Sequence, residues 1–92
     1  MNTPDLEKLL DAGVACHVAG ELEEALFCYG TALEMDPGNV LALYNIALVF
    51  EEVGDLATAA EAFEWAAKCS AERDCYDPDI IAAARSYKGG VN

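Results

Sequence analysis

The chain of 92 residues contains an internal repeat with a period of 34 residues. Residues 6–39 align with residues 40–73 without a gap. Five aligned positions are identical, namely Leu9/Leu43, Gly20/Gly54, Leu22/Leu56, Ala25/Ala59 and Ala32/Ala66. A repeat of this length predicts a small structural unit that buries its apolar face by stacking on its neighbour.

Each unit has the pattern of two helices separated by a turn. Apolar residues recur at helical spacing, and Gly20, Gly54 and the segment Asp36-Pro37-Gly38 interrupt them. Thr3, Asn39 and Asp55 are suited to cap helix starts, and Pro4 suits a first helical position. We therefore expect helices over Pro4–Ala19, Glu21–Met35, Val40–Val53, Leu56–Ser70 and Pro78–Tyr87.

Residue size along the repeat predicts how paired helices pack. Gly13, Ala25 and Ala32 are small enough to let two helices approach closely, while Leu9 and Tyr29 fill the space between them. Gly20 and Gly54 stand where the chain reverses, a position that favours a residue tolerant of positive φ.

A helix–turn–helix unit of 34 residues with these features closely resembles the tetratricopeptide repeat. The resemblance departs from the family pattern at Leu9 and Leu43, where tryptophan is usual, at Cys16 in place of a bulky aromatic residue, and at Ala71 in place of proline. It implies an all-α fold of five helices, with antiparallel hairpins stacked as a short right-handed solenoid. Residues 1–92 would form a single domain, with repeat one at 6–39, repeat two at 40–73 and a C-terminal capping helix at about 78–87.

The resemblance also implies a concave groove, lined by the first helix of each unit, that binds an extended peptide or a partner's helix. The groove residues would be Leu10, Val14, His17, Leu41, Tyr44, Asn45, Leu48, Glu51 and Glu52. Asn45 resembles a family asparagine that hydrogen-bonds the backbone of a bound peptide. The four aliphatic residues fit core packing equally well, Glu51 and Glu52 also fit a solvated face, and His17 fits a partly exposed surface position.

Members of one subgroup, the co-chaperones that bind Hsp70 and Hsp90, hold a peptide's terminal carboxylates in a clamp of Lys, Arg and Asn. In this chain Leu10 and Val14 occupy places where that clamp needs Lys and Asn, and Asn45 alone matches. Without cations, the site cannot offset the cost of desolvating carboxylates. We therefore do not expect this activity.

The charge of the chain restricts its partners. Seventeen acidic residues against five basic ones give a net charge of −12, and eleven of the acids lie between Lys8 and Lys68, where Lys and Arg are absent. The negative electrostatic field of these residues repels nucleic acid and anionic membranes and favours a basic partner. The alternative is that the charge only keeps an apolar surface soluble. The lack of a signal-peptide pattern and of a long apolar run predicts a cytoplasmic protein.

No residue pattern in the chain indicates catalysis. The four cysteines have none of the spacings typical of zinc sites, and His17 has no nucleophile at a recognisable motif spacing. Gly-rich phosphate loops and calcium loops do not occur either. We expect reduced, unliganded thiols, no metal or other cofactor, and no enzyme activity.

Two functional classes remain. The first is a protein-interaction module that binds a peptide or helix with apolar anchors and basic flanks. The second is a structural unit that assembles with itself, since Phe27 and Trp65 occupy positions on the second helices that usually carry outward-facing polar residues. A weak homodimer through these two aromatic residues follows, unless the C-terminal helix covers Trp65.

Overall fold

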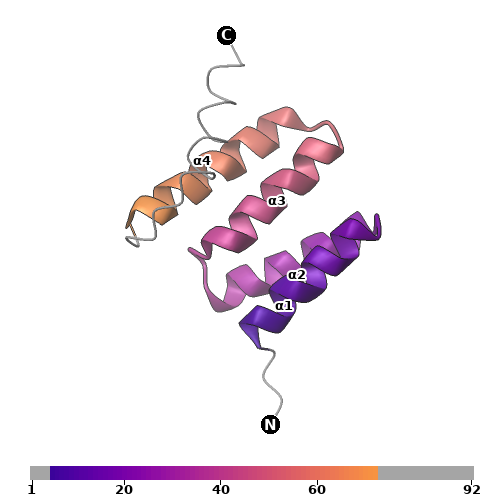
Figure 1. The fold of residues 1–92 in the computed structure, drawn as a ribbon. Coiled ribbons are helices and arrows are strands. Elements are labelled where there is room, and N and C mark those ends of the chain that lie inside the picture. Colours follow the sequence, from indigo (N-terminus) through magenta and orange to yellow (C-terminus); the bar gives the residue numbers. More distant parts are fainter. Residues whose placement is uncertain (1–4, 73–92) are drawn as a thin grey trace.

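The computed structural model describes residues 5–72, which form four helices and no strand. The helices are α1 (Leu6–Val18), α2 (Leu22–Met35), α3 (Val40–Glu52) and α4 (Leu56–Glu72), shown in Figure 1. The four helices expected in this region are confirmed. The fifth, expected at about 78–87, lies outside the described residues, as does any cover it gives to Trp65.

The helices pair as two antiparallel hairpins, α1 with α2 and α3 with α4. The hairpins stack because α2 packs against α3, and α1 also contacts α3 (Figure 1). The first helices of the two units therefore lie side by side on one face. In the part of the chain that the structure describes, no helix is both long and apolar enough to span a bilayer.

Side-chain caps fix three of the helix starts. Asn39 accepts a hydrogen bond from the Ala42 N–H at 2.9 Å, and Asp55 accepts one from the Thr58 N–H at 3.2 Å, as expected. The expected start of the first helix at Pro4 is wrong. Asp5 is the N-cap and accepts from the Glu7 N–H at 3.0 Å, so α1 begins at Leu6. An aspartate at this place satisfies a free N–H and complements the positive end of the helix dipole.

The turns within the two hairpins have the same geometry. Gly20 has φ +83° and Gly54 has φ +87°, which confirms the expected left-handed conformation. In the first turn the N–H of Gly20 bonds the carbonyl of His17, and the N–H of Glu21 bonds that of Cys16. Gly54 and Asp55 make the equivalent bonds in repeat two. Both α1 and α3 therefore end in a Schellman motif.

The core consists of repeat-equivalent residues. Tyr29 and Phe63 are among the largest fully buried side chains, and the alanines at positions 25, 32, 59 and 66 are completely buried. A Cβ added to Gly13 would lie 2.4 Å from the Tyr29 ring, so α1 and α2 approach closely there. The small residues therefore do allow close approach, as the repeat pattern predicts.

The surfaces where the two hairpins meet differ from the equivalent surfaces of the outer helices, α1 and α4. Ile46 and Val49 of α3 pack against the cluster around Tyr29, whereas the equivalent residues of α1, Ala12 and Ala15, are exposed. On α4, Ala60 and Ala67 replace the larger Leu26 and Leu33 of α2. Large apolar side chains are therefore concentrated where one hairpin meets the other.

Candidate peptide-binding face

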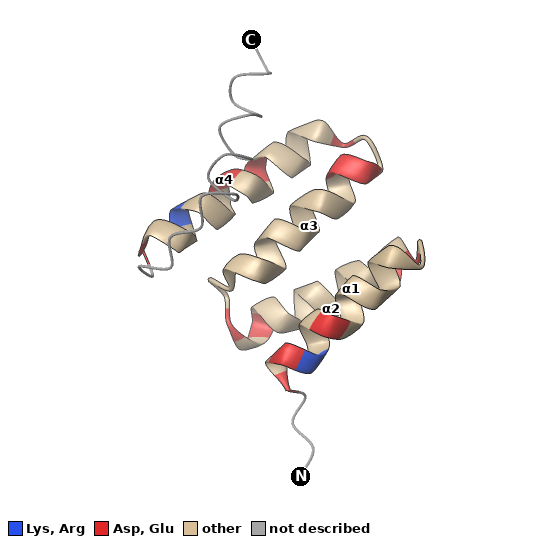
Figure 2. Ribbon diagram, viewed as in Figure 1, with Lys and Arg blue, Asp and Glu red and all other residues tan. Residues whose placement is uncertain are grey.

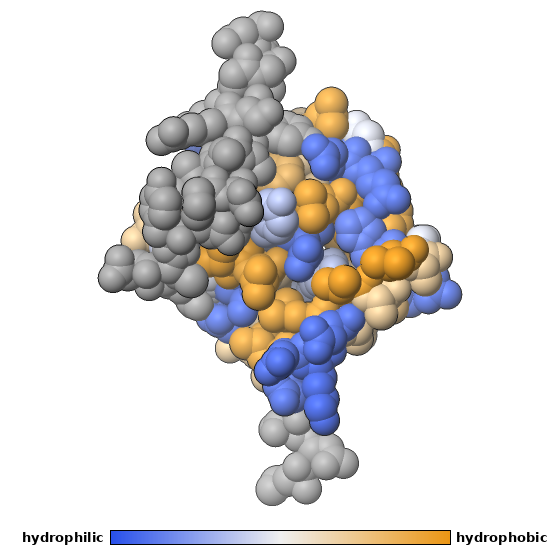
Figure 3. Space-filling model, viewed as in Figure 1, coloured by the Kyte–Doolittle hydropathy of each residue, from blue (hydrophilic) through white to orange (hydrophobic). Residues whose placement is uncertain are grey.

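The residues expected to line the groove lie on two neighbouring helices. Leu10, Val14 and His17 belong to α1, and the remaining six belong to α3. α1 and α3 are in contact, and we call the surface that these two helices form the α1/α3 face. Figure 3 shows apolar side chains on this side of the molecule, with hydrophilic ones between them.

The aliphatic residues of this face divide into an exposed and a packed group. Val14 is 43% exposed and Leu41 is 55% exposed. Leu10 instead packs against the Tyr29 cluster, and Leu48 packs against the cluster of Ala47, Ala59 and Phe63. Val14 and Leu41 are therefore available to a ligand, while Leu10 and Leu48 mainly form the floor beneath it.

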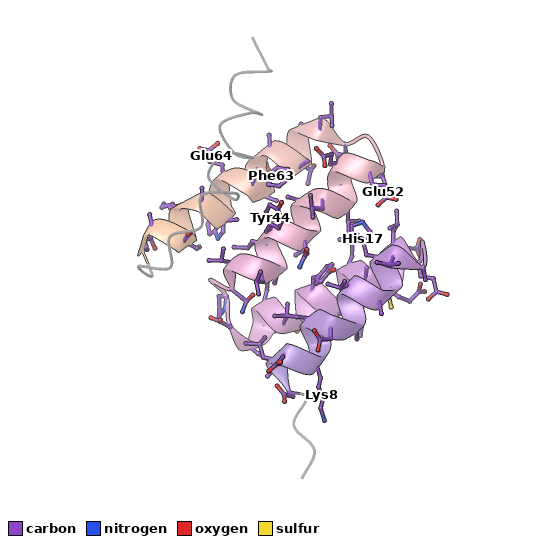
Figure 4. All side chains as sticks on the ribbon, in the orientation of Figure 1. Lys8, His17, Tyr44, Glu52, Phe63 and Glu64 are labelled. Carbon is purple, nitrogen blue, oxygen red and sulfur yellow. The ribbon has the colours of Figure 1, made fainter. Side chains whose placement is uncertain are left out.

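Tyr44 joins the α1/α3 face to the core of repeat two. Its ring meets that of Phe63 edge to face, with centroids 5.6 Å apart and an interplanar angle of 63°. Figure 4 shows the two rings between α3 and α4. This packing holds a half-buried aromatic ring at a fixed position, which is typical of a binding-site residue that loses little side-chain entropy on binding.

Asn45 is half-buried beside Tyr44 on α3. In residues 5–72 no hydrogen bond joins its side-chain amide to another residue. Within that range the carbonyl and amino groups of Asn45 have no partner, and both can hydrogen-bond the backbone of a ligand.

A side-chain hydrogen bond connects the two helices at one end of the face. His17 Nε2 lies 2.6 Å from Glu52 Oε2, and the two side chains point toward each other from α1 and α3 (Figure 4). Both residues were expected on this face, but their pairing was not. A signal for it is present in the repeat, because His17 aligns with Glu51, one residue from Glu52.

The charge on α3 is confined to its C-terminal end. The helix carries no charged side chain from Val40 to Phe50, and then ends in Glu51 and Glu52 (Figure 2). The last turn has no basic residue. Carboxylates at this place are unfavourable because the helix dipole adds about half a negative charge there. The arrangement therefore concentrates negative potential at one end of an apolar surface.

Behind this face, two groups titrate abnormally. Burial raises the pKa of the Cys16 thiol, and Cys28, Glu21 and Glu24 raise it further. Burial, followed by the nearby thiols of Cys28 and Cys16, raises the pKa of Tyr29. Sequence reasoning did not indicate that the two thiols influence each other, because Cys16 lies four residues before Gly20 and Cys28 lies eight residues after it.

Metal-ligating residues do not gather anywhere in the described part of the chain. No group of three or more His, Cys, Asp or Glu side chains is placed to hold an ion there. Cys16, Cys28 and Cys69 are free thiols, and Cys75 lies outside the described residues.

The two exposed aromatic residues lie on the second helices. Phe27 of α2 is 75% exposed and Trp65 of α4 is 57% exposed. The Lys68 Nζ lies 5.9 Å from the centre of the Trp65 ring, within the range of a cation–π contact. Both rings are therefore accessible surface features.

Comparison with known proteins agrees with this geometry. Residues 13–54 match a family model described as a TPR repeat, a range that contains α2, α3 and the turns at both ends of that pair. The N-terminal domain of stress-induced protein-1 (STI-1) from C. elegans has the same fold, with a TM-score of 0.82 and 29% identity over 92% of this chain. Residues 13–54 therefore carry a tetratricopeptide repeat.

A curated relative supports the same assignment. The tetratricopeptide-repeat chain is 31% identical over 60 residues, or 65% of its length, to the probable UDP-N-acetylglucosamine–peptide N-acetylglucosaminyltransferase SPINDLY of Hordeum vulgare. It covers 6% of SPINDLY and 66% of the STI-1 domain. The similarity to SPINDLY therefore concerns a short segment of a much longer protein. Tetratricopeptide repeats generally mediate interactions between proteins, and this coarse function applies to the chain.

Proposed function

We propose that the α1/α3 face binds a peptide or helix that has apolar anchor residues flanked by Lys or Arg. The exposed side chains of Val14 and Leu41 supply apolar contact area, and the half-buried Tyr44 ring supplies a rigid surface. The Asn45 amide supports this proposal because it can hydrogen-bond a ligand backbone.

The observation that carries the proposal is the pair of glutamates at the C-terminal end of α3. Glu51 and Glu52 follow eleven uncharged residues and lie at the negative end of the helix dipole. A local arrangement that disfavours the helix is common at functional sites. A basic residue of a ligand would relieve the repulsion, because it brings positive charge to both carboxylates.

The same charges argue against a ligand that ends in free carboxylates. Lys8 and Lys68 are the two lysines among residues 5–72, and His17 is engaged with Glu52. Lys68 lies on α4, and Lys8, although it lies in the first turn of α1, is not one of the nine groove residues, so none of those nine is a lysine or arginine. The proposed ligand class therefore differs from that of the carboxylate-binding co-chaperones.

Stopped-flow binding with labelled amphipathic peptides tests this function. Three peptides share apolar anchors and differ in flanks, which are basic, neutral or acidic with a free C-terminal carboxylate. We expect the basic peptide to bind best, with an association rate that falls as salt rises. The variant Glu51→Lys with Glu52→Lys should weaken binding mainly through that rate.

A charge-matched control distinguishes an effect of the charges at the α1/α3 face from an effect of the net charge of the protein. Glu23→Lys with Glu34→Lys changes the net charge equally, but both residues lie on α2, away from the α1/α3 face. This control should slow association much less than the variant on α3. Preference for the acidic peptide, or equal effects of the two double variants, would refute the proposal.

The second candidate is self-association through Phe27 and Trp65. Their exposure favours it, since aromatic side chains are common anchors of protein interfaces. A dimer would also add buried area to a small core. Sedimentation at increasing concentration in low and high salt tests it. We expect a weak dimer that tightens with salt, because salt screens the negative charge, and a monomer mass at high micromolar concentration would exclude it.

A further inference from the structure

His17 and Glu52 meet where the last turn of α1 lies against the last turn of α3. His17 Nε2 lies 2.6 Å from Glu52 Oε2, and the two side chains point toward each other (Figure 4). An ionised carboxylate accepts hydrogen bonds and cannot donate them, so Nε2 carries the hydrogen. The contact is therefore a hydrogen bond that α1 donates to α3.

The fold holds the donor more firmly than the acceptor. The side chain of His17 is 19% exposed, whereas that of Glu52 is 55% exposed. The carbonyl of His17 accepts a hydrogen bond from the N–H of Gly20, which orders the end of α1. The carbonyl of Glu51 accepts one from the N–H of Gly54, which orders the end of α3. A packed imidazole on an ordered helix end therefore restrains a carboxylate that is otherwise largely in solvent.

The hydrogen bond uses one of the two carboxylate oxygens of Glu52. Oε2 accepts from His17, and within residues 5–72 Oε1 has no hydrogen-bond partner. A carboxylate has about four acceptor positions on its two oxygens, so one donor does not saturate it. A cationic group can therefore bind Glu52 while His17 stays in place.

We propose that His17 is a positioning residue, which fixes the Glu52 carboxylate for a Lys or Arg side chain of the ligand. This inference rests on the proposed function of the α1/α3 face. An unrestrained glutamate side chain loses conformational entropy when a cation binds to it, and His17 removes that freedom in advance. The restraint favours a basic flank over a neutral one, because a neutral flank brings no charge to the carboxylate.

Two uncharged substitutions of similar length test this role. His17→Gln retains an N–H donor, whereas His17→Met has none. Gln and Met have similar helix propensities, so the comparison isolates the donor. Titration calorimetry measures the affinities of each full-length protein for the basic-flanked and the neutral-flanked peptide, and their ratio describes the specificity. Incompletely folded protein lowers both affinities alike and leaves this ratio unchanged.

The wild type and His17→Gln should prefer the basic peptide to a similar degree. His17→Met should reduce this preference roughly 3- to 10-fold, the effect expected from immobilising one flexible side chain. A merely structural role of His17 would weaken both peptides equally. Competition between His17 and the ligand for Glu52 would instead increase the preference in His17→Met. Either result, or a His17→Gln variant that behaves like His17→Met, would overturn the inference.

Glutamine substitutions of the two glutamates provide a matched control. Glu51→Gln and Glu52→Gln each remove one negative charge from the same end of α3. The effect of His17→Met should persist beside Glu51→Gln and vanish beside Glu52→Gln, because Glu52 is the acceptor. Equal effects in the two backgrounds would contradict the inference alone. A wild type that does not prefer the basic peptide would refute the proposed function, and this inference with it.

Discussion

The Tyr29 hydroxyl is buried, and within residues 5–72 it is the buried side-chain oxygen or nitrogen without a hydrogen-bond partner. The equivalent residue in repeat two is Phe63, which fills the same site without a hydroxyl. The sequence indicates that both rings fill core space, but it does not reveal that one of them buries an unsatisfied polar atom. That difference is visible only once the surrounding atoms are placed.

Replacing Tyr29 with phenylalanine should therefore stabilise the fold. We expect the free energy of unfolding to rise by about 1 kcal/mol, because the variant no longer desolvates a hydroxyl. Urea denaturation at neutral pH measures this change. The reverse substitution, Phe63→Tyr, is the matched control and should destabilise the fold.

The advantage of Tyr29→Phe should grow at alkaline pH. Burial raises the pKa of Tyr29 in the folded protein above its usual value, so this tyrosine ionises first in the unfolded chain. The stability of the wild type consequently falls as pH rises through about 10, while the phenylalanine variant lacks this loss. Unfolding curves at neutral and alkaline pH measure the gap between the two proteins, and a gap that narrows would contradict the argument.

Gly13 and Gly30 provide a second pair of predictions for single residues. At Gly13 an added Cβ meets the Tyr29 ring, whereas at Gly30 an added Cβ meets nothing within 4 Å. Gly13→Ala should cost about 1–2 kcal/mol, because overpacking outweighs the gain in helix propensity. Gly30→Ala should stabilise by about 0.5–1 kcal/mol. Thermal unfolding compares the two, and equal effects would show that the close approach at Gly13 has no energetic weight.

At the scale of elements, the 34-residue period determined most of what could be predicted. The helices, their glycine stops and the caps at Asn39 and Asp55 follow from local chemistry repeated twice. The start of α1 could not be fixed in the same way, because Thr3 and Asp5 both suit an N-cap and no preceding unit indicates which one is used. The period also does not predict the relative position of α1 and α3 along their axes, so the His17–Glu52 pair is visible only in the structure.

The candidate face shows the same division between local and long-range information. The resemblance placed Leu10 and Val14 together, and the sequence left open whether they are core or surface. Packing decides the question, because Leu10 contacts the Tyr29 cluster and Val14 remains exposed. Side-chain burial depends on neighbouring helices, which the pattern of one helix does not contain.

The two Schellman turns predict equal sensitivity to substitution. Gly20→Ala and Gly54→Ala should each destabilise the protein by about 1–2 kcal/mol, because both glycines have a left-handed backbone conformation and neither is sterically crowded. Asparagine tolerates this conformation better, so Gly54→Asn should cost less than Gly54→Ala. Denaturation midpoints of the three variants test the order, and alanine variants as stable as the wild type would contradict it.

At the scale of the whole molecule, the net charge of −12 opposes compactness. Repulsion between the acids is screened when the Debye length falls from about 30 Å to about 3 Å. The thermal midpoint should therefore rise as sodium chloride is added. An uncharged osmolyte at the same osmolality is the control, and a midpoint that falls with salt would show that attractive ion pairs outweigh the repulsion.

The alanines on the outer helices have a consequence for any assembly of this protein. Stacking one copy on the next, α4 against α1, would be a head-to-tail contact, which produces an open filament unless its rotation closes into a ring. Ala12 and Ala15 at one pole, and Ala60 and Ala67 at the other, offer such a contact little apolar area. The proposed association through Phe27 and Trp65 would instead use the second helices, where a two-fold axis could relate two copies and end the growth. The alanines on α1 and α4 would then favour a closed dimer over a fibre.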